Sequence, residues 1–347
     1  MLKTSYLQPA AVALSFTFLL GCGPRESSST STSSLTHPSD NLTDSNPNSG
    51  HANKGICSNL DFMGFSWPSD MFEFEKEALE VALNITGSFE GFGGWQNLTN
   101  DFDGQGLSMG LMNQTLGTGS LQPLLLKMRQ LHFDKFQSLF QADHFQSLMT
   151  MLSNWENSNV RQSSSEVVSP LDLGSPELSA NEASAFSSVE WARRTIYDSP
   201  GVFNPIWKNE LLKLASSHEY VSLQINAAWD LHLRALALHK MMAVYELRTY
   251  LLMFDIVVQN GNLKPEDEVD YRNYVRHNPR ATAQQRLEKI VNLRLRWVKP
   301  QYRNDVRARK MSLINGFGQV HGVSRQYEKE FCFNRKQIFP RRPTPLP

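Results

Sequence analysis

Two acidic residues, Glu90 and Asp103, stand close together in the chain, on segments with different expected structures. Glu90 follows an apolar pattern that predicts a helix over 71–86, and Asp103 opens the glycine-rich turn 103–106. Hydrolysis of a glycosidic bond uses two carboxyl groups, one as the acid and the other as the base or nucleophile. A solvated helix end followed by an ordinary turn gives the same pattern, so the rest of the chain must decide between them.

The surroundings of the two acids predict different charge states. Glu90 would lie just past a helix C-terminus, where the helix dipole disfavours negative charge, and burial beside aromatic rings favours its neutral form. The candidate rings are Phe89, Phe92 and Trp95. Asp103 stands in a polar turn with backbone N–H groups, so we expect it to stay ionised. Such a difference is typical of an acid–base pair, although Asp101 is a competing candidate for the base.

The composition of the chain excludes several classes of function. The 347 residues include 34 basic and 34 acidic side chains, so the net charge is zero, which argues against nucleic acid as a partner. No acid stands at ligand spacing from His232 and His239, and no HExxH motif or zinc-type cysteine pair occurs. A phosphate-binding loop and a serine nucleophile elbow are also missing. We therefore expect no metal and no other cofactor.

The N-terminus has the features of an export signal. A basic residue at position 3 precedes an apolar run over 10–20, which is too short for a stable membrane span. Small Gly21 then precedes Cys22, and the segment resembles a bacterial lipoprotein signal. That resemblance implies removal of residues 1–21 and lipidation of Cys22, which would anchor the exported protein to a membrane, in the periplasm or at the cell surface. An ordinary secretory signal is the alternative.

The rest of the chain divides by composition. Residues 22–56 are rich in Ser, Thr and Asn and predict a flexible tether, residues 57–335 predict the folded domain, and residues 336–347 predict a polar tail. Of the three cysteines, Cys57 and Cys332 remain near the two ends of the folded domain. In an oxidising compartment they are a plausible disulfide pair, and two buried free thiols are the alternative.

The periodicity of apolar residues predicts a mainly α (α+β) protein. Helices are expected over 71–86, 121–130, 133–153, 183–198, 204–215, 266–277, 282–297 and 303–314, and over 217–255 as two pieces. A small β-hairpin is expected over 97–111, and an exposed excursion rich in Ser and Pro over 160–182.

The stretch around the two acids resembles the bacterial chitosanases of the lysozyme superfamily. It is still more similar to lysozyme-like bacterial domains with the pattern FDGQG-[IL]-S-x-G followed by LGxGSLQPLL, which here spans 102–125. The resemblance implies a two-lobed helical fold with a hairpin beside the cleft. It also implies that Glu90 is the general acid, that Asp103 is the base for an attacking water, and that Ser108 helps to hold this water.

Further segments resemble the family in the same order along the chain. Asp255, in the segment 254–261, matches an aspartate that anchors a buried ionic network, and Arg294 matches an arginine of that network. The run 303–309 resembles the family's RxDxxxR, with Arg303 and Asp305 as its first members. By this resemblance the four residues hold Glu90 from behind; a network that only joins helices is the alternative. Expected substrate contacts are Gly104, Gly106, Asn113, Ser120, Gln259 and Asn260.

Two departures from the family pattern concern the substrate. Ser120 replaces the acid that chitosanases use for a cationic glucosamine, and Asn113 replaces a glutamine of the lysozyme-like relatives. Both favour a neutral, acetylated sugar, so the predicted activity is cleavage of β-1,4 bonds in peptidoglycan, possibly deacetylated in part. Inversion is expected if the carboxyl groups lie roughly 6.5–9.5 Å apart. The alternatives are a chitosanase, a lytic transglycosylase that needs only the acid, and a non-catalytic peptidoglycan-binding lipoprotein.

Overall fold

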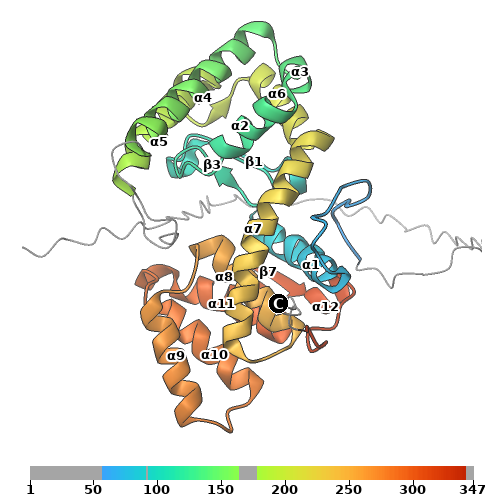
Figure 1. The fold of residues 1–347 in the computed structure, drawn as a ribbon. Coiled ribbons are helices and arrows are strands. Elements are labelled where there is room, and N and C mark those ends of the chain that lie inside the picture. The colour runs from blue at the N-terminus through green and yellow to red at the C-terminus, as the bar shows by residue number, and fades with distance from the viewer. Residues whose placement is uncertain (1–56, 91–92, 164–177, 341–347) are drawn as a thin grey trace, which may run out of the picture. The chain divides into compact units, whose positions relative to one another are not determined.

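The computed structural model describes residues 57–90, 93–163 and 178–340, with the backbone alone at 159–163, 178–184 and 260. The described part is mainly helical (Figure 1). Its α-helices are α1 (Glu73–Glu90), α2 (Gln122–Leu131), α3 (Phe133–Ser138), α4 (Ala142–Ser163), α5 (Leu178–Thr195), α6 (Pro205–Ser216), α7 (His218–Met242), α8 (Leu247–Asn260), α9 (Pro265–His277), α10 (Ala283–Leu295), α11 (Arg303–Asn315) and α12 (Tyr327–Glu330).

Short strands and 3-10 turns connect these helices. The strands are β1 (Leu98–Thr99), β2 (Ser108–Met109), β3 (Gln114–Thr115), β4 (Tyr197–Ser199), β5 (Val202–Phe203), β6 (Phe317–Val320) and β7 (Val323–Gln326). The 3-10 turns are η1 (Gly94–Gln96), η2 (Asp101–Asp103) and η3 (Pro300–Tyr302). Among the helices of the described residues, none combines the length and the apolar character that crossing a bilayer requires. The predicted signal, Cys22 and the tether lie outside the described residues.

Buried apolar side chains form two hydrophobic cores. The first core is built from α1, α8, α10 and α11, with the C-terminal half of α7 and the segment around Tyr327. The second core is built from α2, α3, α4, α5 and α6, with residues of β2 and β4 and the first turns of α7. Each helix contributes the face on which its apolar residues recur, because burial of that face provides most of its stability.

Helix α7 contributes to both cores. Ser217 caps its start, because the Oγ atom accepts a hydrogen bond from the Tyr220 N–H at 3.3 Å. Tyr220 and Leu223 pack in the second core, whereas Leu238 packs in the first. The helix ends where Ala243 takes a left-handed conformation (φ 52°), and this is the break predicted within 217–255. Figure 1 shows α7 next to α2 and α8, with which it packs.

Helix α1 extends beyond its predicted end. The expected range was 71–86, with Gly87 as the stop, but the helix continues to Glu90. Gly87 lies inside the helix and packs against the loop that carries Leu111. A Cβ atom at this position would be only 2.4 Å from Cδ1 of Leu111. The glycine therefore allows the close approach of a neighbouring loop, and Glu90 occupies the last helical position instead of following the helix.

The predicted hairpin is part of a three-stranded sheet in the order β1-β2-β3. Both pairings are antiparallel, with Thr99 opposite Ser108 and Ser108 opposite Thr115. The added strand β3 was not expected from the sequence, since a two-residue strand has no detectable periodicity. Gln224 of α7 holds the connection between β2 and β3, because its buried Oε1 atom accepts a hydrogen bond from the Leu111 N–H at 2.8 Å.

Two predicted ranges in the second core were wrong. The helix expected over 133–153 is divided into α3 and α4, because the Gln141 N–H donates to Oε1 of Glu210 at 2.9 Å instead of continuing a helix. The excursion expected over 160–182 is partly helical, since α4 runs to Ser163 and α5 begins at Leu178. Residues 164–177 of that range lie outside the described part.

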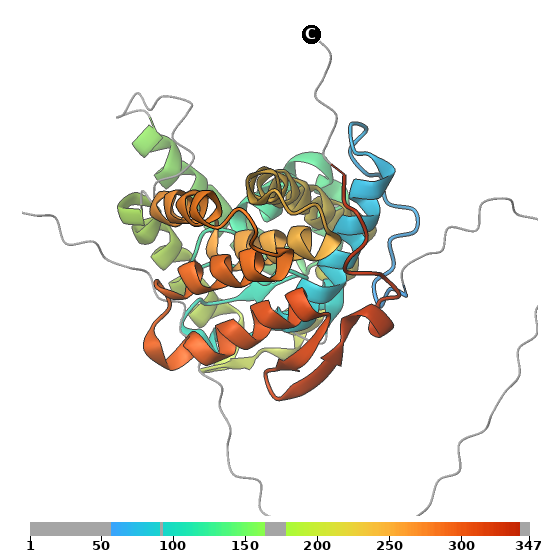
Figure 2. The ribbon, with the colours of Figure 1, turned by 90° about the horizontal axis from the view of Figure 1, so that it is seen from below.

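The C-terminal segment packs against α1 and α8. Figure 2 shows the hairpin β6-β7 and α12 (red) beside α1 (blue to cyan), and the rings of Phe89 and Tyr327 lie 6.0 Å apart. Residues 336–340, expected in a polar tail, are folded, because Phe339 is buried and the Leu247 N–H donates to the Gln337 carbonyl at 2.9 Å. A disulfide joins Cys57 to Cys332, with their Cα atoms 5.1 Å apart.

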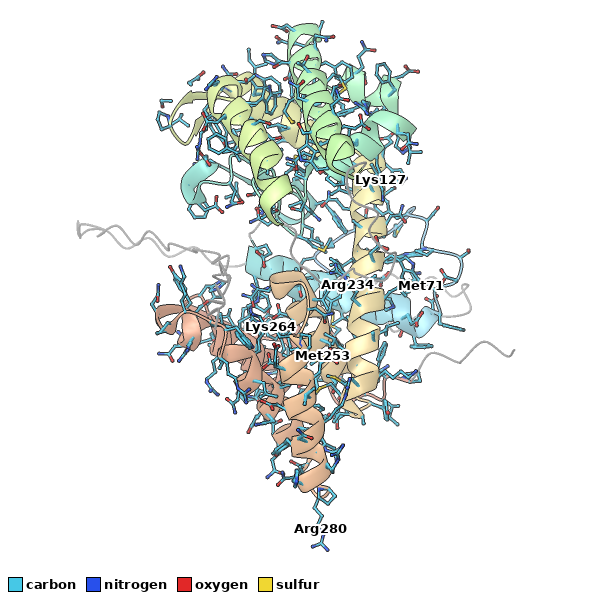
Figure 3. All side chains as sticks on the ribbon, turned by 60° about the vertical axis from the view of Figure 1, so that its left-hand side comes forward. Met71, Lys127, Arg234, Met253, Lys264 and Arg280 are labelled. Carbon is cyan, nitrogen blue, oxygen red and sulfur yellow. A yellow bond between two sulfur atoms is a disulfide. The ribbon has the colours of Figure 1, made fainter. Side chains whose placement is uncertain are left out.

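The end of α8 is held by a side chain of α7. Arg234, labelled in Figure 3, donates from Nη1 to the carbonyl oxygen of Gly261 at 3.2 Å. Gly261 follows the last residue of α8 with a φ of 76°, and a cation near a helix C-terminus is favoured by the helix dipole. This contact fixes the final turns of the helix that carries Asp255 and Gln259.

Candidate active site

Glu90 lies at the C-terminus of α1 with its side chain only 9% exposed. Its Oε1 atom is 3.0 Å from both terminal nitrogens of Arg309, Nη1 and Nη2, and its backbone carbonyl accepts a hydrogen bond from Asn97 Nδ2 at 3.2 Å. The Arg309 guanidinium also lies 4.3 Å from the centre of the Phe89 ring. Phe89 is thus the predicted aromatic neighbour that covers this group, while Phe92 lies outside the described residues.

Arg309 shares its charge with a second, fully buried carboxylate. Oδ1 of Asp255 is 2.8 Å from Arg309 Nε and 2.7 Å from Nη2, and Oδ2 is 2.8 Å from Nζ of Lys310. Burial alone would raise the pKa of Asp255, but the positive charges of Arg309 and Lys310 outweigh it and lower the pKa below its usual value. Burial likewise opposes the charge of Arg309, yet the two carboxylates raise its pKa. The resulting group is an ionised network behind Glu90.

The network contains different basic residues from those predicted. Arg303 is exposed and donates from Nε to the Val298 carbonyl at 3.0 Å, and Asp305 lies 3.2 Å from Nε2 of His321. Neither residue contacts Glu90 or Asp255, so their assignment to the network was wrong. The reason is helical geometry: Arg303 is the first residue of α11, and the buried face of that helix comprises Val306, Arg309, Lys310, Leu313 and Ile314.

Arg294 of α10 lies near the network without joining it. Within the described residues, no carboxylate forms an ion pair with Arg294. Burial lowers its pKa, while the charge of Asp267 opposes that shift. The charge of Arg294 also acts on Lys310, where it disfavours protonation. The predicted role of Arg294 is therefore limited to a distant electrostatic influence on this network.

The turn that carries the candidate base distinguishes its two acids. Asp101 is held by Arg193 of α5, whose Nε lies 2.5 Å from Oδ2, and by the Gly106 N–H, 2.6 Å from Oδ1. Asp103 accepts only the Gln105 N–H, at 3.1 Å from Oδ1, among the contacts of the described residues. Both oxygens of Asp101 are thus engaged in fixing the turn. Asp103 is the better candidate for a base because it retains lone pairs for a water molecule.

Partial burial affects the acidity of Asp103. Burial raises its pKa above the usual value, and the nearby charge of Asp101 adds to that shift, while the hydrogen bond from Gln105 opposes it. The raised pKa differs from the expectation that Asp103 lies in a solvated polar turn. The reason is that α5 packs on the turn and partly buries it. A base with a raised pKa accepts a proton more readily once it is ionised.

Two glycines give the turn its shape. Gly104 has a φ of 81° and ends η2, and Gly106 has a φ of 78°. A Cβ atom on Gly106 would lie 2.9 Å from Cα of Val189, so α5 packs directly on the backbone of the turn. Tyr197 holds the same place by donating from its hydroxyl to the Gly106 carbonyl at 2.6 Å. The positions of Arg193 and Tyr197 were not predicted, because nothing in their local sequence indicates contact with the turn.

The three-stranded sheet connects the acid to the predicted water-binding residues. Asn97 Nδ2, which contacts the Glu90 carbonyl, also lies 3.4 Å from Oδ1 of Asn113, and Thr99 Oγ1 is at the same distance from that atom. Asn113 adopts a φ of 51° that directs the chain into β3. Ser108 is fully buried, and no described residue forms a hydrogen bond with its Oγ atom. A buried hydroxyl of this kind fits the role of a water ligand.

The remaining predicted substrate contacts occupy different surroundings. Ser120 is exposed, and its Oγ accepts the Thr115 N–H at 2.9 Å and lies 2.8 Å from Thr118 Oγ1, so it stabilises a turn. Gln259 is partly buried and accepts a hydrogen bond from Lys310 Nζ at 2.9 Å. Asn260 ends α8, and its side chain lies outside the described part.

His232 and His239 have structural surroundings. His232 Nδ1 lies 2.7 Å from the Tyr250 hydroxyl, and the His239 ring packs on Phe339. In the described ranges, no group of three or more His, Cys, Asp or Glu side chains could hold a metal ion.

No model of a protein family matches the chain, and no curated protein matches it either.

Proposed function

We propose that the protein is an exported glycoside hydrolase that cleaves β-1,4 bonds in an amino-sugar polymer, namely peptidoglycan. The observation that carries the proposal is the anchoring of Glu90: a nearly buried carboxyl group at a helix end is held by Arg309, which is itself fixed by buried Asp255. An arrangement that buries the charged groups of Arg309 and Asp255 beside Glu90 is costly unless those charges are paired. Such an arrangement is expected where one carboxyl group must keep a defined position.

In the proposed reaction Glu90 is the general acid. It protonates the oxygen of the leaving sugar while the bond to the anomeric carbon breaks, and positive charge develops on the ring. Arg309 and Asn97 hold the side chain and the backbone of Glu90, respectively, so that the acid does not need to reorient during the reaction. Asp255 balances the charge of Arg309 through its own contacts with Nε and Nη2.

Asp103 is proposed as the general base. It takes a proton from water as the water oxygen attacks the anomeric carbon, and the product has the inverted configuration. The Asp103 carboxylate is supported by the Gln105 N–H, and Asp101 with Arg193 keeps the turn in place. Ser108 and Asn113 supply further polar groups on the sheet that continues from this turn.

The proposed substrate follows from the absence of an acid at position 120. The Ser120 hydroxyl is used within its own turn, and it carries no charge that could attract a cationic glucosamine. A neutral N-acetylated sugar does not need such an attraction. Export of the protein would bring it to the cell wall, where this type of sugar forms the glycan strands.

The test is digestion of purified sacculi, both acetylated and deacetylated, and of chitosan oligomers, with mass spectrometry of the soluble products. We expect muropeptide-containing fragments with new reducing ends from sacculi, and loss of at least about 100-fold in rate for Glu90→Gln and Asp103→Asn. Glu77→Gln, an exposed position on the same helix, is the matched control and should keep full rate.

Other outcomes would assign other functions. Faster release from chitosan than from any sacculus would make the protein a chitosanase. Products without reducing ends, together with full activity of Asp103→Asn, would indicate a lytic transglycosylase. Binding to sacculi without release of fragments, unchanged by Glu90→Gln, would show a non-catalytic wall-binding protein and would reject the proposed chemistry.

A further inference from the structure

Lys310 is a fully buried amine in the network behind Glu90. Its Nζ atom lies 2.8 Å from Oδ2 of Asp255 and 2.9 Å from Oε1 of Gln259, and both Lys310 and Asp255 have side chains with no exposed area. Lys310 has no contact with Glu90 in the described residues. Its burial is unfavourable in itself and is offset by the contact with Asp255, whose other cation, Arg309, is shared with Glu90.

The two oxygens of Asp255 are divided between the two cations. Arg309 donates from Nε to Oδ1 at 2.8 Å, and its Nη2 lies 2.7 Å from the same atom, whereas Lys310 donates from Nζ to Oδ2. The preferred arrangement of an arginine with a carboxylate is a fork in which two nitrogens contact two different oxygens. Lys310 occupies the second oxygen that such a fork would use, and the guanidinium lies at Oδ1 with both terminal nitrogens 3.0 Å from Glu90 Oε1.

We propose that Lys310 is a positioning residue for Glu90, because its occupation of Asp255 Oδ2 keeps Arg309 directed at the acid. When Lys310 is removed or neutral, Arg309 can turn to contact both oxygens of Asp255, and Glu90 loses its fixed orientation. The same amine joins this network to Gln259, near the end of α8. The inference rests on the proposed role of Glu90 as the general acid.

The charges around Lys310 make this device sensitive to pH. Burial lowers the pKa of Lys310 to about 8, the charge of Asp255 in α8 opposes that shift, and Arg309 of α11 and Arg294 of α10 add to it. Glu90 of α1 contacts Arg309 and influences Lys310 only through that residue. Lys310 is therefore protonated at neutral pH and loses its proton in mildly alkaline solution, where Oδ2 of Asp255 becomes available to Arg309.

The first test compares the rates of Lys310→Met and Lys310→Arg with the wild type on sacculi, using the full chain. For Lys310→Met we expect kcat to fall at least tenfold with KM within about twofold, since the acid is affected and glycan binding is not. In the wild type, kcat should fall roughly tenfold between pH 7 and pH 9, as expected for one essential group with this pKa. Lys310→Arg should keep activity at pH 7 and lose that alkaline decrease, because arginine stays charged.

Lys299→Met, an exposed position before η3, is the matched control and should show the wild-type profile. A wild-type kcat that is constant from pH 7 to pH 9, or an identical alkaline decrease in Lys310→Arg, would overturn the proposal. Retention of full kcat by Lys310→Met would overturn it as well.

A second measurement does not depend on activity or on the folding of the variants. In the full-length wild type, NMR of ¹³Cε-labelled lysine should show one buried amine that titrates near pH 8. The signal is assigned to Lys310 by its disappearance in Lys310→Arg. If that variant does not fold, the signal is assigned by its lack of solvent exchange. An ordinary titration near pH 10.5 would reject the proposal.

If this amine titrates near pH 8 but no glycan is cleaved at any pH, the proposed function fails while the charge coupling remains. If glycan is cleaved but the alkaline decrease is absent, the Lys310 proposal fails alone.

Discussion

Arg309 and Glu90 are separated by 219 positions in the chain, yet the guanidinium of one lies 3.0 Å from the carboxylate of the other. The contact joins α11 to the last residue of α1. The exposed fraction of the side chain is 2% for Arg309 and 9% for Glu90. An ion pair in such a position holds its partners firmly, because solvent cannot replace either of them. The candidate acid is thus fixed by the C-terminal part of the chain.

Arg309→Gln should destabilise the protein strongly. The change leaves Asp255 with one cation and removes the partner of Glu90, and breaking a buried ion pair costs about 3–5 kcal/mol. Denaturant unfolding of the wild type and the variant would measure this loss. Arg303→Gln is the matched comparison on the same helix, and it should change the free energy of unfolding by less than about 0.5 kcal/mol because Arg303 is exposed. Equal losses in both variants would contradict the assignment of the network.

Asp101 and Asp103 should respond differently to replacement by asparagine. Asp101→Asn weakens the contact with Arg193, so the turn should lose stability by about 1–3 kcal/mol. Asp103→Asn should leave the melting temperature nearly unchanged and abolish hydrolysis, because that carboxyl group makes few contacts of its own. Thermal unfolding and glycan digestion on the same preparations would separate the two effects. The reverse pattern would identify Asp101 as the base.

Alanine substitutions at the two glycines of the turn should differ in their cost. Gly104→Ala imposes a left-handed conformation on alanine, which costs about 1–2 kcal/mol, and its nearest neighbour is a flexible arginine atom 3.8 Å away. Gly106→Ala adds a contact of 2.9 Å with the backbone of Val189, so it should cost more and displace α5 from the turn. Urea unfolding gives both values. A smaller loss for Gly106→Ala would show that α5 is not packed on the turn.

The stability of the protein should depend on pH through Asp255. Its folded pKa lies below the ordinary value of 3.8, so its contribution to stability is complete above that value and is lost as the pH falls through the folded pKa. Urea unfolding between about pH 2 and pH 6 should therefore show a decrease in acid that is smaller in Asp255→Asn. An equally steep decrease in that variant would mean that other carboxylates determine the acid sensitivity.

Reduction of the disulfide should lower stability without changing the site directly. Cys57 and Cys332 close a loop with a sequence separation of 275, and a cross-link of this length restricts the unfolded chain. The double variant Cys57→Ala/Cys332→Ala should lose about 2–4 kcal/mol in the free energy of unfolding and keep its kcat at low temperature. Loss of kcat in a folded double variant would show that the bridge also positions the site.

Much of the helical framework could be predicted, whereas the contacts that complete the site could not. Most predicted helices agree with the structure within a few residues, because their apolar faces repeat with the helical period. Gly87 is predicted to end the helix, but it lies within α1 and allows close packing against Leu111. That packing partner comes from a later segment of the chain. Local sequence carries no information about such contacts.

The ionic network illustrates the same limit. Asp255 is predicted from its segment, with Arg294 and Arg303 as its basic partners, whereas the structure has Arg309 and Lys310 there. The helical period of α11 could have corrected this, since Val306, Arg309 and Leu313 share one face with the expected spacing. Lys310 could not have been identified in this way, because a buried lysine is rare and is placed by its partners. Arg193 and Tyr197 likewise reach the turn only through the packing of α5 and β4.

The order of the network residues along the chain has a consequence for biosynthesis. The candidate acid lies at position 90, its carboxylate support at 255, and the two cations at 309 and 310. A nascent chain that ends before α11 therefore has the acid but lacks the groups that hold it. Under the proposed function, the protein would gain its activity only after the C-terminal part of the chain has been synthesised and folded.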